Sequence, residues 1–115
     1  MRRLYLHVVV VLLLSSFVAS CGASDSEFTI RVTGDASVTF SGPYMVVKAD
    51  GSSVGKTVES RAPVDYKVTG LIVSVVFQKQ TDRSDLLRVQ ILKGGKVIAE
   101  AETRAAYGIA SVSTR

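Results

Sequence analysis

Apolar and polar residues alternate with a period of two along most of the chain after residue 27. This alternation predicts strands with one buried face, and Gly, Pro and Asp turn signals divide them. A further run, 71–77, is almost continuously apolar, which is typical of a strand in the middle of a sandwich. The strands are expected at 28–33, 38–40, 44–48, 64–69, 71–77, 87–91, 97–102 and 107–112.

Turn signals and strand lengths together predict the fold class. Gly94-Gly95 between two Lys residues predicts a tight hairpin, because glycine takes the positive φ angles of a two-residue turn. Seven or eight short strands, with turns about every 8–12 residues, predict an all-β antiparallel sandwich over 28–115. A small barrel is the alternative, since one sequence does not give the strand order.

The first 20 residues have a different pattern from the rest. Positive Arg2 and Arg3 precede an uncharged apolar stretch, which predicts an export signal helix over 1–20. The following Val18-Ala19-Ser20-Cys21 resembles a bacterial lipobox. The resemblance implies cleavage between Ser20 and Cys21, a diacylglycerol on the Cys21 thiol and acylation of the new amine. A lipidated Cys21 and a short polar tether then occupy 21–27.

Two other interpretations of this segment stay open. Cys21 could be an ordinary thiol close to a conventional cleavage site. The segment could also remain as an uncleaved anchor, because 4–24 is 21 residues without formal charge and a membrane span needs about 20.

Composition narrows the function classes. The 115 residues are 47% hydrophobic and 21% charged, with one Cys, one His and no Trp. A disulfide framework and a Cys/His zinc site are therefore excluded, and no metal or other cofactor is expected. The net charge of +4 falls to +2 once Arg2 and Arg3 are removed, and both signs of charge alternate in the remainder. Without a basic stripe, nucleic acid is not an expected partner.

Two loops carry residues that could suggest ligand chemistry. The segment 51–57, Gly-Ser-Ser-Val-Gly-Lys-Thr, looks like the end of a phosphate-binding loop, but three residues separate its glycines where that motif has four. We interpret it as a Gly/Ser-rich turn between strands. Asp82 and Asp85 could be Ca²⁺ ligands, but Arg83 lies between them and the loop has too few oxygen ligands. A solvated turn is the simpler interpretation.

Candidate catalytic groups are few. Glu100 and Glu102 fall on one face of a predicted strand, which we interpret as its solvated face and not as an acid–base pair. After cleavage no His remains, Cys21 is lipidated, and no Gly-x-Ser-x-Gly spacing occurs. The sequence therefore predicts a protein that is not an enzyme.

Ile72 and Val76 are the candidate partner-facing positions. They fall on the face opposite Val73, Val75 and Phe77. If the fold leaves that face uncovered, it is an apolar patch for a transporter subunit, another partner or a small apolar ligand. The tyrosines that remain after cleavage, which are expected to have a buried ring and a solvated hydroxyl or else to join such a patch, are Tyr44, Tyr66 and Tyr107.

The strand sequences resemble the MmpS family of small membrane-associated proteins. The motifs that carry the resemblance are Phe28-Thr-Ile-Arg-Val-Thr-Gly34, Ala36-Ser-Val-Thr-Phe40, Ala62-Pro63-Val64, Leu87-Arg-Val-Gln-Ile91 with the Gly-Gly turn and Val97-Ile98, and Ala106-Tyr107-Gly108. The resemblance implies an immunoglobulin-like sandwich at the outer face of the cytoplasmic membrane, where some members assist RND-type (MmpL) exporters.

The chain also departs from that family. Leu87 and a Ser near 111 or 113 stand where the family has paired cysteines, and Val64 stands where it has a tryptophan. The expected function is a lipid-anchored, non-catalytic binding or accessory module at the cell envelope, on the cell membrane or, in a diderm host, the outer membrane. The alternative is a small ligand-binding or structural envelope lipoprotein without a transporter partner.

Overall fold

The computed structural model describes residues 23–114, and this part of the chain is built from β-strands. The eight strands are β1 (Ser26–Gly34), β2 (Thr39–Val47), β3 (Ser53–Arg61), β4 (Val64–Gly70), β5 (Ile72–Lys79), β6 (Leu87–Lys93), β7 (Lys96–Thr103) and β8 (Ile109–Ser113). The prediction of an all-β fold with seven or eight strands is confirmed. The expected signal helix over 1–20 lies outside the described residues.

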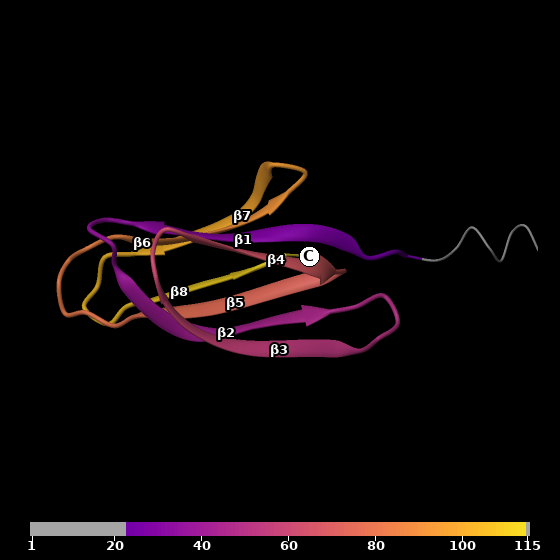
Figure 1. The fold of residues 1–115 in the computed structure, drawn as a ribbon, viewed down its shortest axis with the longest axis horizontal. Coiled ribbons are helices and arrows are strands. Elements are labelled where there is room, and N and C mark those ends of the chain that lie inside the picture. The colour runs from indigo at the N-terminus through magenta and orange to yellow at the C-terminus, as the bar shows by residue number, and fades with distance from the viewer. Residues whose placement is uncertain (1–22, 115) are drawn as a thin grey trace, which may run out of the picture.

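The strands form two antiparallel sheets of four, in the orders β4-β1-β6-β7 and β3-β2-β5-β8. Figure 1 shows the two sheets lying along the same long direction. All the pairings are antiparallel, which fits strands that are buried on one side and solvated on the other. The arrangement is the predicted sandwich.

The core lies between the sheets and is made by every second residue of the central strands. Ile30 and Val32 of β1 are fully buried, and so are Val73 and Phe77 of β5. An aromatic cluster joins the two sheets: the Phe40 and Phe77 rings lie 4.9 Å apart, and Tyr66 of β4, Tyr44 of β2 and Phe77 are within ring-packing distance. Tyr44 and Tyr66 are therefore partly buried core residues, as one of the two interpretations expected.

Two predictions about β2 and β3 are wrong. Gly42-Pro43 does not end a strand: β2 runs through both residues. Gly42 and Pro43 do not pair with β5: the pairing stops at Ser41–Gln78 and resumes at Tyr44–Val75. The proline, which has no N–H to donate, therefore lies where β2 and β5 are not paired. The backbone of Gly42, with a φ of 150°, also lies so close to Val76 that a Cβ would collide with the Val76 carbonyl oxygen.

The segment 53–57 is not a turn, because it begins β3. Strand β3 lies at the edge of its sheet and its first five residues are exposed, so it has no buried alternation for a sequence pattern to detect. The turn is shorter than predicted: it centres on Ala49-Asp50, the Gly51 amide donates to the Lys48 carbonyl oxygen, and Gly51 has a φ of 88°. The Asp50 carboxylate accepts hydrogen bonds from the Ser52 amide and hydroxyl, which lower the pKa of Asp50.

The β6–β7 connection is the predicted hairpin. Gly94 and Gly95 both have positive φ, 59° and 75°, as a type I′ turn requires. Smaller differences concern strand ends: β1 begins at Ser26, within the segment predicted to be a tether, and β8 begins at Ile109, after the exposed Tyr107.

Candidate functional site

The outer face of the β4-β1-β6-β7 sheet is densely charged. Arg31 of β1 lies opposite Asp65 of β4 and pairs with it at 3.1 Å, and this pairing raises the pKa of Arg31. Arg88 of β6 pairs with Glu102 at 2.9 Å and with Glu100 at 3.4 Å. We call this surface the charged face; its charged side chains are Glu27, Arg31, Asp65, Lys67, Arg88, Glu100 and Glu102.

The outer face of the other sheet is uncharged over three of its four strands, and its edge strand β3 turns Glu59 and Arg61 outward at the margin. Within Thr39–Val47, Ile72–Lys79 and Ile109–Ser113, Lys79 is the one charged residue, and it points inward and is fully buried. We call the outward-facing surface of β2, β5 and β8 the uncharged face. Its side chains are Thr39, Ser41, Pro43, Met45, Val47, Ile72, Ser74, Val76, Gln78, Ile109, Ser111 and Ser113.

The uncharged face exposes large apolar side chains along its whole length. Met45 is 50% exposed, Val76 41%, Ile72 38% and Ile109 57%. Ile72 starts β5 at the end of the sandwich where β1 also starts, and Ile109 starts β8 at the opposite end. The structure thus places Ile72 and Val76 on the outward side of β5, exposed, as the alternation predicted.

A shallow apolar hollow lies in this face. It has a volume of about 310 Å³, and its lining includes Pro43, Met45, Ser74 and Val76. The hollow exists because Gly55 of β3 lies opposite Met45 and contributes no side chain. A protruding apolar side chain or a small apolar ligand matches its size and chemistry.

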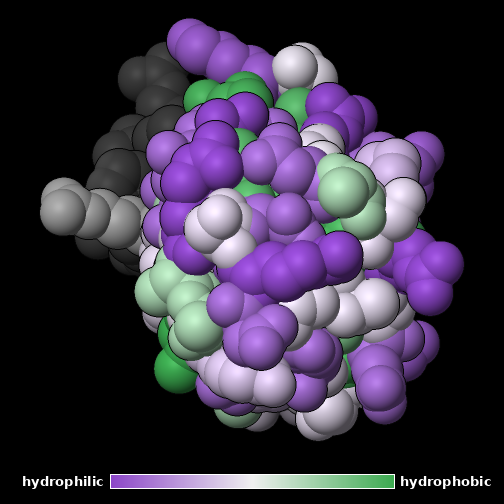
Figure 2. All heavy atoms as spheres, turned by 90° about the vertical axis from the view of Figure 1, so that its left-hand side faces the viewer, coloured by the Kyte–Doolittle hydropathy of each residue, from purple (hydrophilic) through white to green (hydrophobic). Residues whose placement is uncertain are grey.

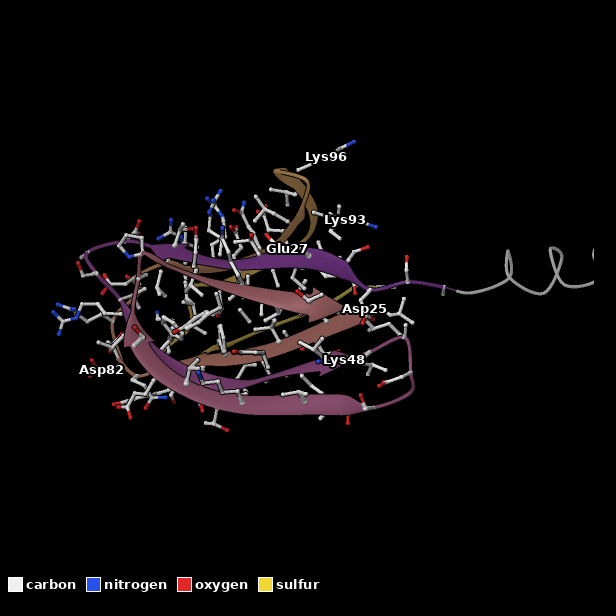
Figure 3. The ribbon with its side chains drawn as sticks, turned by 45° about the vertical axis from the view of Figure 1, so that its right-hand side comes forward. Asp25, Glu27, Lys48, Asp82, Lys93 and Lys96 are labelled. Atoms are coloured by element: carbon white, nitrogen blue, oxygen red, sulfur yellow. The ribbon has the colours of Figure 1, made fainter. Side chains whose placement is uncertain are left out.

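A second cavity, of about 440 Å³, lies at the end where β1 starts. Its lining includes Ser24, Phe28, Leu71, Lys93 and Ile98, so it brings the first described residues next to the β6–β7 hairpin. Figure 3 shows Lys93 and Lys96 on this hairpin and Asp25 and Lys48 at the same end of the sandwich. The Asp25 carboxylate accepts a hydrogen bond of 2.7 Å from the Ala49 amide, which fixes the start of the domain to the β2–β3 turn.

The opposite end of the sandwich is polar, and Figure 2 shows hydrophilic side chains over most of it. Beneath this surface the buried Lys79 ammonium donates hydrogen bonds to the carbonyl oxygens of Arg83, at 2.6 Å, and Arg104, at 3.3 Å. Lys79 therefore ties the β5–β6 loop to the β7–β8 loop. The alternation along β5 indicates this position. Lys79 follows Phe77 by two residues, as Phe77 follows Val75, so its side chain falls on the inward side of the strand.

The candidate ligand groups of this end do not converge. Asp85 pairs with Arg83 at 3.2 Å, so the intervening arginine neutralises one of the two proposed Ca²⁺ ligands. In residues 23–114 no group of three or more His, Cys, Asp or Glu side chains is placed to hold a metal ion. Asp82 lies at the tip of the loop, far from the charged groups at the other end (Figure 3).

The candidate acid–base pair is also engaged in other contacts. Glu102 accepts from Arg88, and Glu100 accepts a hydrogen bond of 2.9 Å from the side-chain amide of Gln90. Both carboxylates lie on the solvated face of the edge strand β7, as the sequence indicated.

Tyr107 does not fit the interpretation of a tyrosine with a buried ring. The residue is 54% exposed, and its backbone takes a φ of 52°, a conformation that is strained for a residue with a side chain. Its amide donates to the Thr81 carbonyl oxygen and its own carbonyl oxygen accepts from the Gln78 side chain. These bonds fix the backbone of Tyr107, two residues before Ile109 of the uncharged face.

The proposed lipidation and cleavage positions, Cys21 and Ser20, lie outside the described residues, as does Arg115. In the part of the chain that the structure describes, no helix is long and apolar enough to cross a membrane. No family model matches the chain, and no curated protein matches it. The resemblance to MmpS proteins therefore stays a prediction from the short strand motifs.

Proposed function

We propose that the protein is a non-catalytic docking module of the cell envelope, an immunoglobulin-like sandwich held at a membrane through a lipid on Cys21. The uncharged face makes its contact with a partner. The observation that carries the proposal is the contrast between the two outer faces, since one sheet exposes ion pairs to water and the other exposes Met45, Ile72, Val76 and Ile109. Contiguous apolar surface on a soluble domain marks interaction sites.

The face also has the anatomy of an interface core. Interfaces are depleted of charged residues at their centre and surrounded by polar groups. Here Met45 and Val76 lie around a hollow, Ser74 and Ser111 supply neutral hydrogen-bonding groups, and Glu59 of β3 lies toward the margin. A partner that covers β2, β5 and β8 therefore removes no exposed charge of these strands from water.

The absence of catalysis is supported by what the acidic groups do. Asp65 and Glu102 are ion-paired with Arg side chains, and Glu100 accepts from Gln90. Asp65 lines a shallow hollow together with its partner Arg31, and Glu100 and Glu102 lie on the solvated side of β7. The single His and the single Cys of the sequence, His7 and Cys21, both precede the described residues. Chemistry at neutral pH usually requires such groups to converge in a pocket.

The membrane anchor is supported by distance. Strand β1 starts at Ser26, five residues after Cys21, and an extended chain of that length reaches about 17 Å. The domain would therefore stay close to the membrane surface. Two or three acyl chains hold a protein there firmly, because each buried CH₂ contributes about 0.8 kcal/mol. An exporter subunit is the partner class implied by the family resemblance, and a small apolar ligand in the hollow is the second candidate.

The test compares one substitution on each face. Full-length protein at native level is purified in mild detergent with Val76→Lys or with Thr69→Lys, which adds the same charge to the exposed outer side of β4. A buried, unpaired lysine costs more than the about 1.4 kcal/mol that a factor of ten requires, so Val76→Lys should reduce partner capture roughly tenfold or more. Thr69→Lys should leave capture unchanged.

The same purification tests the anchor, because intact mass reports cleavage and acyl chains. A processed, acylated Cys21 is expected, and Cys21→Ser should accumulate as unprocessed precursor. Equal capture by both lysine variants would contradict docking through the uncharged face. A wild-type mass without lipid would contradict the anchor and leave the docking surface to be judged separately.

A further inference from the structure

We propose that the β6–β7 hairpin is a membrane-contact site, in which Lys93 and Lys96 bind the phosphate groups of anionic phospholipids and Val97 and Ile98 enter the interfacial layer. This inference rests on the membrane anchor of the proposed function and adds a second contact, which orients the domain. It follows from an opposed pair of lysines, from the apolar residues beside them and from a cavity that joins the hairpin to the chain start.

Two lysines stand directly opposite each other at the tip of the hairpin. Lys93 of β6 pairs with Lys96 of β7 in the strand register, so both side chains leave the same side of the hairpin. Like charges in this position destabilise a strand pair. The segment 91–99 contains no acidic residue, and each ion pair within residues 23–114 is made by an arginine. An anion that contacts both ammonium groups would remove the repulsion between them.

The positive charge of the hairpin is available to a ligand. Both lysines are exposed, and Figure 3 shows them extending from the hairpin into open space. The Lys93 ammonium lies 5.8 Å from the centre of the Phe28 ring, which favours a cation at this position. The carboxylates at this end of the sandwich have other positions: Asp25 and Asp50 accept hydrogen bonds from the β2–β3 turn, and Glu27 lies on the outer side of β1.

Large apolar side chains follow the lysines on β7. Val97 is 41% exposed and Ile98 is 46% exposed. The pairing of β6 with β7 shifts between Ile91 and Leu92 and skips Ile98, and such a bulge changes the direction of a side chain. Lysines beside exposed apolar side chains suit a membrane surface, because the ammonium groups stay at the level of the lipid phosphates while the apolar groups lie deeper.

A cavity of about 440 Å³ joins the hairpin to the chain start. Its lining combines the hydroxyl groups of Ser24 and Thr114 with the apolar side chains of Leu71 and Ile98. The glycerol and ester region of a phospholipid presents the same combination of polar and apolar groups. Ser24 follows Cys21 by three residues, so a lipid on Cys21 would keep the cavity within about 10 Å of the membrane surface, at about 3.4 Å per residue.

The membrane contact leaves the uncharged face free. Figure 1 shows the β6–β7 hairpin projecting away from the β3-β2-β5-β8 sheet. A membrane that touches the hairpin and the chain start therefore meets the domain on the side of the other sheet. The uncharged face can then dock its partner while the hairpin stays on the lipid.

A single tryptophan reports this contact, because the sequence contains none. Full-length protein with Val97→Trp, with Ile98→Trp as a second probe, or with Ile109→Trp at the opposite end of the sandwich is reconstituted in vesicles. The vesicles are phosphatidylcholine alone or contain about one-third phosphatidylglycerol, and their acyl chains are brominated close to the glycerol so that they quench tryptophan at the interface. We expect strong quenching of both hairpin probes with phosphatidylglycerol and little quenching of Ile109→Trp.

Removal of the lysine pair tests the phosphate contact. Each lysine close to an anionic surface changes a membrane equilibrium about fivefold, so Lys93→Gln with Lys96→Gln should lower the ratio of docked to undocked hairpin roughly twentyfold. The matched control, Lys56→Gln with Lys67→Gln, removes two charges from β3 and β4 and should leave the quenching unchanged.

Each other outcome overturns the inference. No quenching of either hairpin probe, whether or not the protein floats with the vesicles, contradicts the membrane contact. Quenching that is equal without phosphatidylglycerol, or that survives loss of the lysine pair, contradicts the phosphate contact. Equal quenching of Ile109→Trp contradicts the orientation. The intact mass of the same samples reports the lipid on Cys21, and partner capture reports the uncharged face, so the failure of this inference and the failure of the proposed function are distinguishable.

Discussion

The two outer faces of this sandwich are built by the same kind of strand, yet they expose opposite kinds of side chain. On both sheets, alternate residues are buried, for example Ile30 of β1 and Val75 of β5. The outward residues of β1, β4, β6 and β7 include ion-paired charges such as Arg31–Asp65, whereas those of β2, β5 and β8 are Val, Ile, Met, Pro, Ser and Thr with Gln78. The edge strand β3 adds Glu59 and Arg61 at one margin of the second face. The core requires only the inward residues, so the difference between the faces is not explained by folding.

The side chains of the charged face are hydrated by water and need no partner to cover them. Ion pairs as exposed as Arg88–Glu102 contribute about 0–1 kcal/mol to stability, so the charges serve mainly to keep that face solvated and unattached. The uncharged face lacks this protection, and its exposed Val76 and Ile109 are more easily covered by protein than by water. Under the proposed function, this contrast distinguishes a face that stays in water from a face that docks a partner.

The largest expected effect separates the inward and outward residues of one strand. Phe77→Ala should destabilise the domain by about 3–5 kcal/mol, because Phe77 is fully buried against Phe40. The adjacent Val76→Ala should change stability by less than about 1 kcal/mol, because its side chain is 41% exposed. Denaturant unfolding of both variants measures the difference. Comparable losses would mean that Val76 is a core residue and that the uncharged face is not free.

The next effect concerns the one charged residue of β2, β5 and β8. Lys79→Met keeps most of the side-chain volume but leaves the Arg83 and Arg104 carbonyl oxygens without this donor, which should cost about 1–3 kcal/mol. Lys67→Met, on the exposed side of β4, is the matched control and should stay within about 0.5 kcal/mol. Unfolding midpoints at unchanged slope give both values. A more stable Lys79→Met protein would refute the structural role given to this lysine.

The smallest effect should come from the charged face itself. A double-mutant cycle of Arg88→Met and Glu102→Gln should give a coupling of about 0.2–1 kcal/mol, because both groups are partly exposed. High salt should reduce the coupling, since the Debye length falls to about 3 Å at 1 M. A coupling that is large and insensitive to salt would show that the charged face stabilises the fold more than we infer.

The sequence predicted the sandwich because the inward residues of β1, β4, β5 and β6 alternate regularly. It placed Ile72 and Val76 on the outward side of β5 for the same reason. It did not reveal β3, since an edge strand with five exposed residues leaves no alternation, and 51–57 contains one apolar side chain, Val54.

Other features depend on strand order, which the pattern along one strand does not contain. The continuity of β2 through Gly42-Pro43 depends on the neighbouring β5 backbone, which accommodates a residue without a Cβ and one without an N–H. The uncharged face exists because β2, β5 and β8 are neighbours. Each strand lacks exposed charge by itself, but only their adjacency turns three separate strands into one surface.

The most direct test of the central claim is the accessibility of the uncharged face in native membranes. Ser111→Cys and Thr69→Cys chains are labelled with a bulky polar maleimide in opened membranes and again after dissociation in strong detergent, with the Cys21 parent as background. We expect labelling of Ser111→Cys to be roughly tenfold slower in membranes than after dissociation, and labelling of Thr69→Cys to be alike in both. Equal, rapid labelling of Ser111→Cys in both conditions would show that nothing covers this face and would contradict its role as a docking surface.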